Sequence, residues 1–139
     1  MHVLLIEDNK VNVILATRLL ERFNCTVSSF PWGSDALAYL ADRKSPRPHL
    51  MIIKASHLGI PNGHDTARIL RTQAPFIHDA LLQLTPIIGT IILRPGVNPY
   101  PENHTFMNDF LPKPVKKTAI HWVLLTWARR DPLALKAKL

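Results

Sequence analysis

Apolar and polar residues along this chain form short blocks that predict strands and helices in alternation. Runs that are apolar throughout, or that alternate and contain β-branched residues, predict strands. Apolar residues recurring at a spacing of three or four predict helices. The predicted strands cover residues 3–7, 25–30, 49–54, 86–93 and 110–111. The predicted helices cover residues 11–23, 36–41, 64–71 and 117–129. Residues 76–84 either extend the third of these helices or form a separate helical turn.

Strands that alternate with helices favour a parallel sheet covered by helices on both faces. The chain has 139 residues, which is the length of one domain with a single sizeable core. No internal repeat, linker or low-complexity tract divides it. We therefore predict an α/β fold with a doubly wound parallel sheet, formed by one domain over residues 1–139.

One segment interrupts the pattern between the last two predicted strands. Residues 94–102 contain three prolines and one glycine, so a regular helix cannot run through them. We predict that the helix expected here is lost or disrupted, and the sequence leaves the conformation of residues 94–103 open.

Two acidic residues stand at the end of the first predicted strand. Glu7 and Asp8 come directly after the apolar run, at the sheet edge where α/β folds keep their sites. The segment at 6–12 resembles the opening of response-regulator receiver domains, in the form common in hybrid histidine kinases. The segments at 62–63, 85–88 and 110–115 resemble later receiver motifs, and all four occur in the right order.

The resemblance implies a CheY-like (flavodoxin-like) fold with five strands in the order 2-1-3-4-5. It also implies a site in which the acidic pair Glu7 and Asp8 binds Mg²⁺ beside a phosphorylated Asp. Lys113 corresponds to the Lys that precedes a Pro and contacts the phosphoryl group.

The phosphorylated Asp of that pattern is missing. Its position is Lys54 when counted from the third strand and Ala55 when counted back from Gly63, and no Asp or Glu occurs between residues 49 and 61. The hydroxyl implied at the end of the fourth strand falls at Ile91, while Thr90 points to the opposite face. The aromatic residue that would move with it is Phe110.

Without an acceptor carboxylate, in-line phosphotransfer has no nucleophile. We therefore interpret the chain as a degenerate receiver, or pseudo-receiver, that is not an enzyme and acts by protein–protein contact in a two-component or phosphorelay-type regulator. We expect no cofactor, because losing one of three carboxylates weakens Mg²⁺ binding severely. Residual weak binding at Glu7 and Asp8 is left open.

The remaining charges suggest what occupies this pocket. Glu7, Asp8, Lys54 and Lys113 sum to zero formal charge, as three carboxylates, one Lys and Mg²⁺ do in a working receiver. We hypothesise that Lys54 points into the pocket and takes the place of Mg²⁺. If Ala55 holds the acceptor position instead, Lys54 faces away.

The net charge of +7 bears on the partners. We expect a protein partner, acidic in character: a kinase, a phosphotransfer protein or another domain of the same parent chain. The scattered Lys and Arg residues argue against a nucleic-acid site, and no apolar run could span a membrane.

We expect a cytoplasmic location, with a nuclear one open. The alternative functions are a phosphorylatable receiver with an atypical acceptor and a basic nucleic-acid-binding domain.

Overall fold

The computed structural model describes residues 1–55, 61–96 and 106–128. Its sheet has five parallel strands in the order β2-β1-β3-β4-β5, as predicted. The strands are β1 (His2–Ile6), β2 (Thr26–Phe30), β3 (Leu50–Lys54), β4 (Ile87–Ile92) and β5 (Asp109–Lys113). The helices are α1 (Lys10–Glu21), α2 (Gly33–Ala41), α3 (Gly63–Thr72), the 3₁₀ helix η1 (Phe76–His78), α4 (Ala80–Leu84) and α5 (Lys117–Trp127). None of the helices in the described part of the chain is long and apolar enough to cross a membrane.

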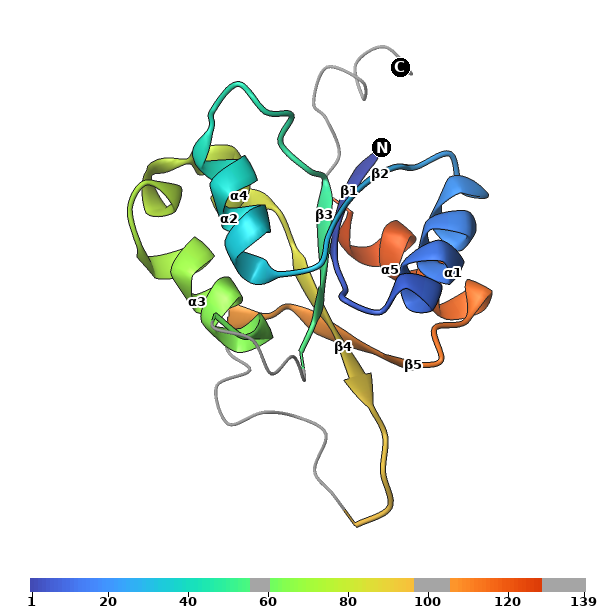
Figure 1. Cartoon of the computed structure of the whole chain (residues 1–139). Coiled ribbons are helices and arrows are strands. Elements are labelled where there is room, and N and C mark those ends of the chain that lie inside the picture. Colours follow the sequence, from blue (N-terminus) through green and yellow to red (C-terminus); the bar gives the residue numbers. More distant parts are fainter. Residues whose placement is uncertain (56–60, 97–105, 129–139) are drawn as a thin grey trace.

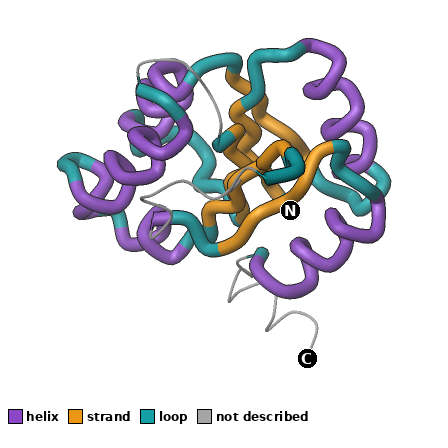
Figure 2. Tube along the Cα trace, turned by 90° about the horizontal axis from the view of Figure 1, so that it is seen from below, coloured by secondary structure: helices purple, strands orange, loops and turns teal. Residues whose placement is uncertain are grey.

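The helices form two layers, one on each side of the sheet (Figure 1, Figure 2). Helices α2, α3 and α4 cover one face, and α1 and α5 cover the other. Alternate residues of each strand supply the two cores, because successive side chains point to opposite faces. In β3, Met51 and Ile53 pack towards α2–α4, whereas Leu50 and Ile52 pack towards α1 and α5.

Several boundaries differ from the predicted ones because caps and edges decide where elements end. Asn9 caps α1, which begins at Lys10. A capping box at Asn62 starts α3 at Gly63. The second helix was predicted to begin at residue 36, which is wrong, since α2 already begins at Gly33. Strand β5 extends to Lys113, because a proline is tolerated in an edge strand and Pro112 lies in one.

The region between α3 and β4 is a separate helical turn, not an extension of α3. Asp79 divides it: η1 ends there, and the Asp79 carboxylate accepts a hydrogen bond from the Leu82 N–H at 3.2 Å to start α4. The label α4 therefore belongs to a helix before β4. The helix predicted to be lost would follow β4, where residues 93–96 form no helix and residues 97–105 lie outside the described residues.

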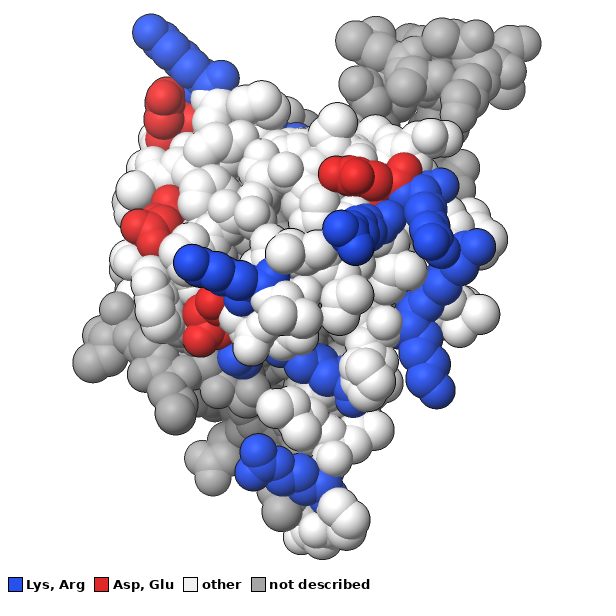
Figure 3. Space-filling model, turned by 45° about the vertical axis from the view of Figure 1, so that its right-hand side comes forward, with Lys and Arg blue, Asp and Glu red and all other residues white. Residues whose placement is uncertain are grey.

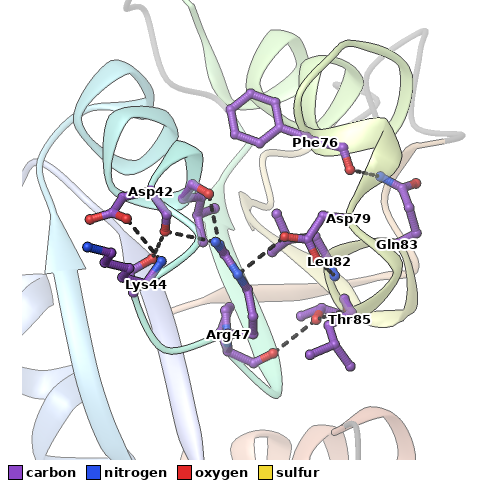
Figure 4. Close-up of polar contacts among 12 residues, drawn as sticks. Asp42, Lys44, Arg47, Phe76, Asp79, Leu82, Gln83 and Thr85 are labelled. Carbon is purple, nitrogen blue, oxygen red and sulfur yellow. Dashed lines mark hydrogen bonds and ion pairs between the residues drawn. The ribbon is translucent and has the colours of Figure 1, made fainter.

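At the edge where the strands begin, one arginine joins two helices (Figure 4). Arg47 donates to the carbonyl oxygens of Leu40 and Asp42, each at 2.8 Å, at the end of α2. Its Nε lies 3.3 Å from Asp79 at the start of α4. This edge lies opposite the acidic corner, so it serves the packing of the α2–α4 layer.

Candidate functional site

The acidic corner is held in place by the start of α1. The Asn9 side chain accepts hydrogen bonds from the N–H groups of Val11 and Asn12, at 3.0 and 3.1 Å, which fixes the first turn of the helix. The Asn9 N–H in turn donates to Glu7 Oε2 at 3.0 Å. Glu7 is buried, with 5% of its surface exposed. The end of β1 and the cap of α1 therefore set the orientation of the Glu7 carboxylate.

Lys54 faces this corner from the end of β3. Strand β3 lies beside β1, with Ile53 opposite Ile6, so Lys54 is level with Glu7. Its ammonium donates to Asp8 Oδ1 at 2.8 Å and lies 3.6 Å from Glu7 Oε2. The Ala55 side chain packs in the core on the α2–α4 face. Of the two residues that spacing left open, Lys54 is the one at the acidic pair.

Lys113 completes the cluster from the end of β5. Its ammonium donates to Glu7 Oε1, and the peptide bond to Pro114 is cis. The side chains of Glu7 and Lys113 are 5% and 15% exposed, so this ion pair is largely shielded from water. Each carboxylate thus has its own ammonium partner, Glu7 with Lys113 and Asp8 with Lys54, and the four groups carry no net charge.

The protonation states follow from these contacts. The hydrogen bond from Lys54 lowers the pKa of Asp8 from 3.8 to about 2. Burial alone would lower the pKa of Lys54, but the hydrogen bond to Asp8 and the charges of Glu7 and Asp8 outweigh it and raise that pKa. Asp8 is therefore ionised and Lys54 protonated throughout the neutral range.

Comparisons with known proteins identify the fold. The chain matches no family model and no curated protein sequence. Among solved structures, it is similar to the receiver domain of a sensor histidine kinase from Pseudomonas aeruginosa PAO1, which has Mg²⁺ coordinated in its active-site cleft. The TM-score is 0.72 and the identity 26%, over 91% of this chain and 95% of that one. The chain has the fold of a response-regulator receiver domain.

Two further solved structures share this fold. The full-length ShkA protein in complex with AMPPNP matches at 29% identity and a TM-score of 0.68, over 91% of this chain and 24% of ShkA. The receiver domain of Ssk1 from Saccharomyces cerevisiae, solved with the phosphotransfer protein Ypd1, matches at 19% identity. Its TM-score is 0.69, over 92% of this chain and 88% of that one.

The receiver resemblance implies a Mg²⁺ site at this acidic corner. Mg²⁺ prefers a shell of six oxygen ligands and is held by carboxylates. Here both carboxylates already bind ammonium groups, and the Lys54 ammonium lies 2.8 Å from Asp8. Within residues 1–55, 61–96 and 106–128, no three His, Cys, Asp or Glu side chains gather as a metal site.

The residues at the positions implied for the receiver switch lie in the core. Ile91 is 3% exposed and packs on the α2–α4 face, with Phe110 half-buried against the same cluster. Thr90 points to the opposite face, towards α1 and α5, as predicted from strand alternation. Whether Ile91 and Phe110 replace a switch stays a prediction.

Sequence reasoning missed two residues that shape the site. A Cβ on Gly63 would lie 2.2 Å from the Lys54 carbonyl oxygen, so only glycine lets α3 begin against the end of β3. Asn12 donates from Nδ2 to Glu7 Oε1 over 3.4 Å. The five-residue separation of Asn12 from Glu7 could have indicated their hydrogen bond. Nothing in the sequence showed that Gly63 packs directly against the backbone of Lys54.

The lowered pKa of Asp8 predicts how stability depends on pH. The pKa in the folded state, about 2, lies below the ordinary value of 3.8, so this group stabilises the fold above about pH 4. The contribution is lost as the pH falls through 2. In urea unfolding between pH 6 and 2.5, we expect the stability difference between wild type and Asp8→Asn to shrink with decreasing pH. Glu21→Gln, an exposed change at the far end of α1, is the control and should show no such convergence.

Proposed function

We propose that this domain is a pseudo-receiver: a signalling module of a two-component or phosphorelay-type regulator that does not accept phosphate and acts through protein contacts. The observation that carries the proposal is the position of Lys54. It ends β3, where the receiver resemblance implies the phosphoacceptor, and its ammonium binds Asp8 at 2.8 Å.

The chemistry of Lys54 argues against phosphotransfer at this point. An attacking group needs a free electron pair in line with the donor's phosphoryl group. The contacts with Asp8 and Glu7 raise the pKa of Lys54, so its nitrogen is protonated and has no such pair. Residues 49–61 supply no carboxylate in its place. A module of this kind catalyses no reaction of its own.

We further propose that Lys54 serves as a built-in cation. Two carboxylates close together at a half-buried edge repel each other unless positive charge lies beside them. Lys113 balances Glu7 and Lys54 balances Asp8 in the described structure. On this proposal, the domain needs no metal, and any Mg²⁺ binding at Glu7 and Asp8 is weak.

The proposed partner is a protein. The Ssk1 receiver forms a complex with the phosphotransfer protein Ypd1, which supports a partner of the kinase or phosphotransfer type. The exposed side of α5 carries Trp122 and Leu125, which are 55% and 62% exposed, and the start of the same helix carries the exposed Lys116 and Lys117. Figure 3 shows further Lys and Arg side chains spread over one side of the molecule. Aromatic and basic groups together suit an acidic protein surface, and the proposed location is the cytoplasm.

Incubation with phosphodonors tests the proposal. We expect no phosphate adduct in intact-mass spectra after incubation with acetyl phosphate and Mg²⁺, and no chemical-shift change with beryllofluoride, because no carboxylate is present at position 54. An active receiver in the same reaction controls for the donor. The matched variant Lys54→Asp restores the third carboxylate and should gain Mg²⁺ binding.

A stoichiometric adduct on the wild-type chain would refute the pseudo-receiver proposal. Peptide mapping would then locate the atypical acceptor. Binding to duplex DNA with a steep salt dependence would instead favour the basic nucleic-acid-binding alternative.

A further inference from the structure

A cavity of about 90 Å³ lies between α1, α5 and the sheet. Its walls are mainly apolar side chains from both helices and from the strands β1, β3 and β5. The main wall residues are Leu5, Ala16, Leu19, Ile52, Leu111 and Ile120. At one end it reaches the ion pair of Glu7 and Lys113 and the side chain of Asn12. The cavity thus has an apolar body and one polar end.

The cavity exists because α1 packs loosely on the sheet. Of the twelve residues of α1, only Leu20 is fully buried. Leu15 lines the cavity and is still 55% exposed, so a path from solvent runs beside it. Ala16, on the cavity side of the helix, is too short to fill the space. A protein interior normally leaves few voids larger than a water molecule, so this space is unusual.

Thr90 places a buried hydroxyl in the wall of this cavity. It lies two residues after Ile88, whose side chain packs on the same face with α1 and α5. Thr90 is 5% exposed and lines the cavity. A threonine hydroxyl can both donate and accept a hydrogen bond, so Thr90 can bind one polar group of an occupant.

We propose that this cavity is a binding site for a small neutral amphiphile, a compact aliphatic molecule bearing one hydroxyl group. The apolar walls favour an aliphatic body, and Thr90 can donate to or accept from its hydroxyl. The paired charges of Glu7 and Lys113 cancel, which favours a neutral ligand over an anion or a cation. The volume is that of about three water molecules and below the roughly 150 Å³ that accommodates benzene, so the body is smaller than an aromatic ring.

A titration with isobutanol, followed by methyl NMR, tests the site. We expect saturable shifts of the Ile52, Leu111 and Ile120 methyl groups, together with NOEs from isobutanol to these methyls. Thr90→Val keeps the side-chain shape, removes the hydroxyl and should weaken binding roughly two- to tenfold, the range for one hydrogen bond. Thr126→Val, on the exposed side of α5, is the matched control and should leave the affinity unchanged.

A variant that fills the space gives the second test. Ala16→Leu should abolish the saturable shifts and raise the melting temperature. Shifts that rise linearly without saturating, or that persist in Ala16→Leu, would overturn the proposal. If that variant does not fold, the wild-type NOEs decide: their absence means that the cavity holds water only, and the proposal fails. These outcomes do not depend on whether the domain accepts phosphate.

Discussion

Replacing Lys113 with Met is expected to lower the free energy of unfolding by about 3 kcal/mol, the low end of the range for breaking a buried ion pair. Glu7 is 5% exposed, and Lys113 provides its closest ammonium group. Removing that ammonium leaves a buried carboxylate with weaker support, since the Lys54 ammonium is 3.6 Å from the other oxygen of Glu7. Urea unfolding at pH 7 measures the loss.

The double variant Glu7→Gln with Lys113→Met is the control for this result. It removes both charges, so it should be more stable than Lys113→Met alone. Wild type, Glu7→Gln, Lys113→Met and the double variant together form a double-mutant cycle. If Lys113→Met lowers the free energy of unfolding by less than roughly 1 kcal/mol, the ion pair of Glu7 and Lys113 stabilises the fold no more than an exposed salt bridge does. The idea that Glu7 depends on Lys113 would then be wrong.

The central strands of the sheet could be predicted from the sequence because they are buried on both faces. The runs 49–54 and 86–93 are mostly apolar, and the structure places strands β3 and β4 within them. The strand order came from the receiver resemblance and is confirmed. Boundaries were predicted less well, since they depend on single caps. Asp79, for example, divides a helical pattern into η1 and α4 through one hydrogen bond.

The register at the site could not be obtained from spacing. Counting from the third strand pointed to Lys54, and counting from Gly63 pointed to Ala55, because the loop between them has no fixed length. The backbone pairing of Ile6 with Ile53 places Lys54 beside the acids. Which ammonium pairs with which carboxylate depends on side-chain directions, and no sequence pattern encodes these.

The cavity could not be predicted from the sequence either. Alternation predicted that Thr90 faces away from Ile91, but whether a neighbour fills the space beside Thr90 depends on the volumes of residues from several elements. Ala16 and Leu19 come from one helix and Ile120 from another. Packing volume is a property of the assembled layers, so the void appears only in three dimensions.

Replacing Lys54 with Ala is expected to lower the free energy of unfolding by about 1–3 kcal/mol, the range for leaving a buried polar or charged group without its partner. The loss should fall in the lower part of this range, because Glu7 keeps Lys113 and the Asp8 side chain is 33% exposed. Thermal melts at pH 7 without metal measure it. Lys44→Ala, an exposed change on the opposite edge of the sheet, is the matched control and should have little effect.

Mg²⁺ distinguishes a built-in cation from an ordinary ion pair. Once the ammonium is gone, Asp8 has lost its partner while Glu7 keeps Lys113, so the pair carries an excess negative charge. A divalent cation that binds there only in the folded state stabilises that state. We expect millimolar Mg²⁺ to recover part of the lost stability in Lys54→Ala and to leave wild type unchanged, because the ammonium already lies 2.8 Å from Asp8. Equal effects of Mg²⁺ on both proteins would show that Lys54 does not occupy the place of the ion. A melting temperature that is the same in both proteins, with and without Mg²⁺, would remove the stabilising role of Lys54 altogether.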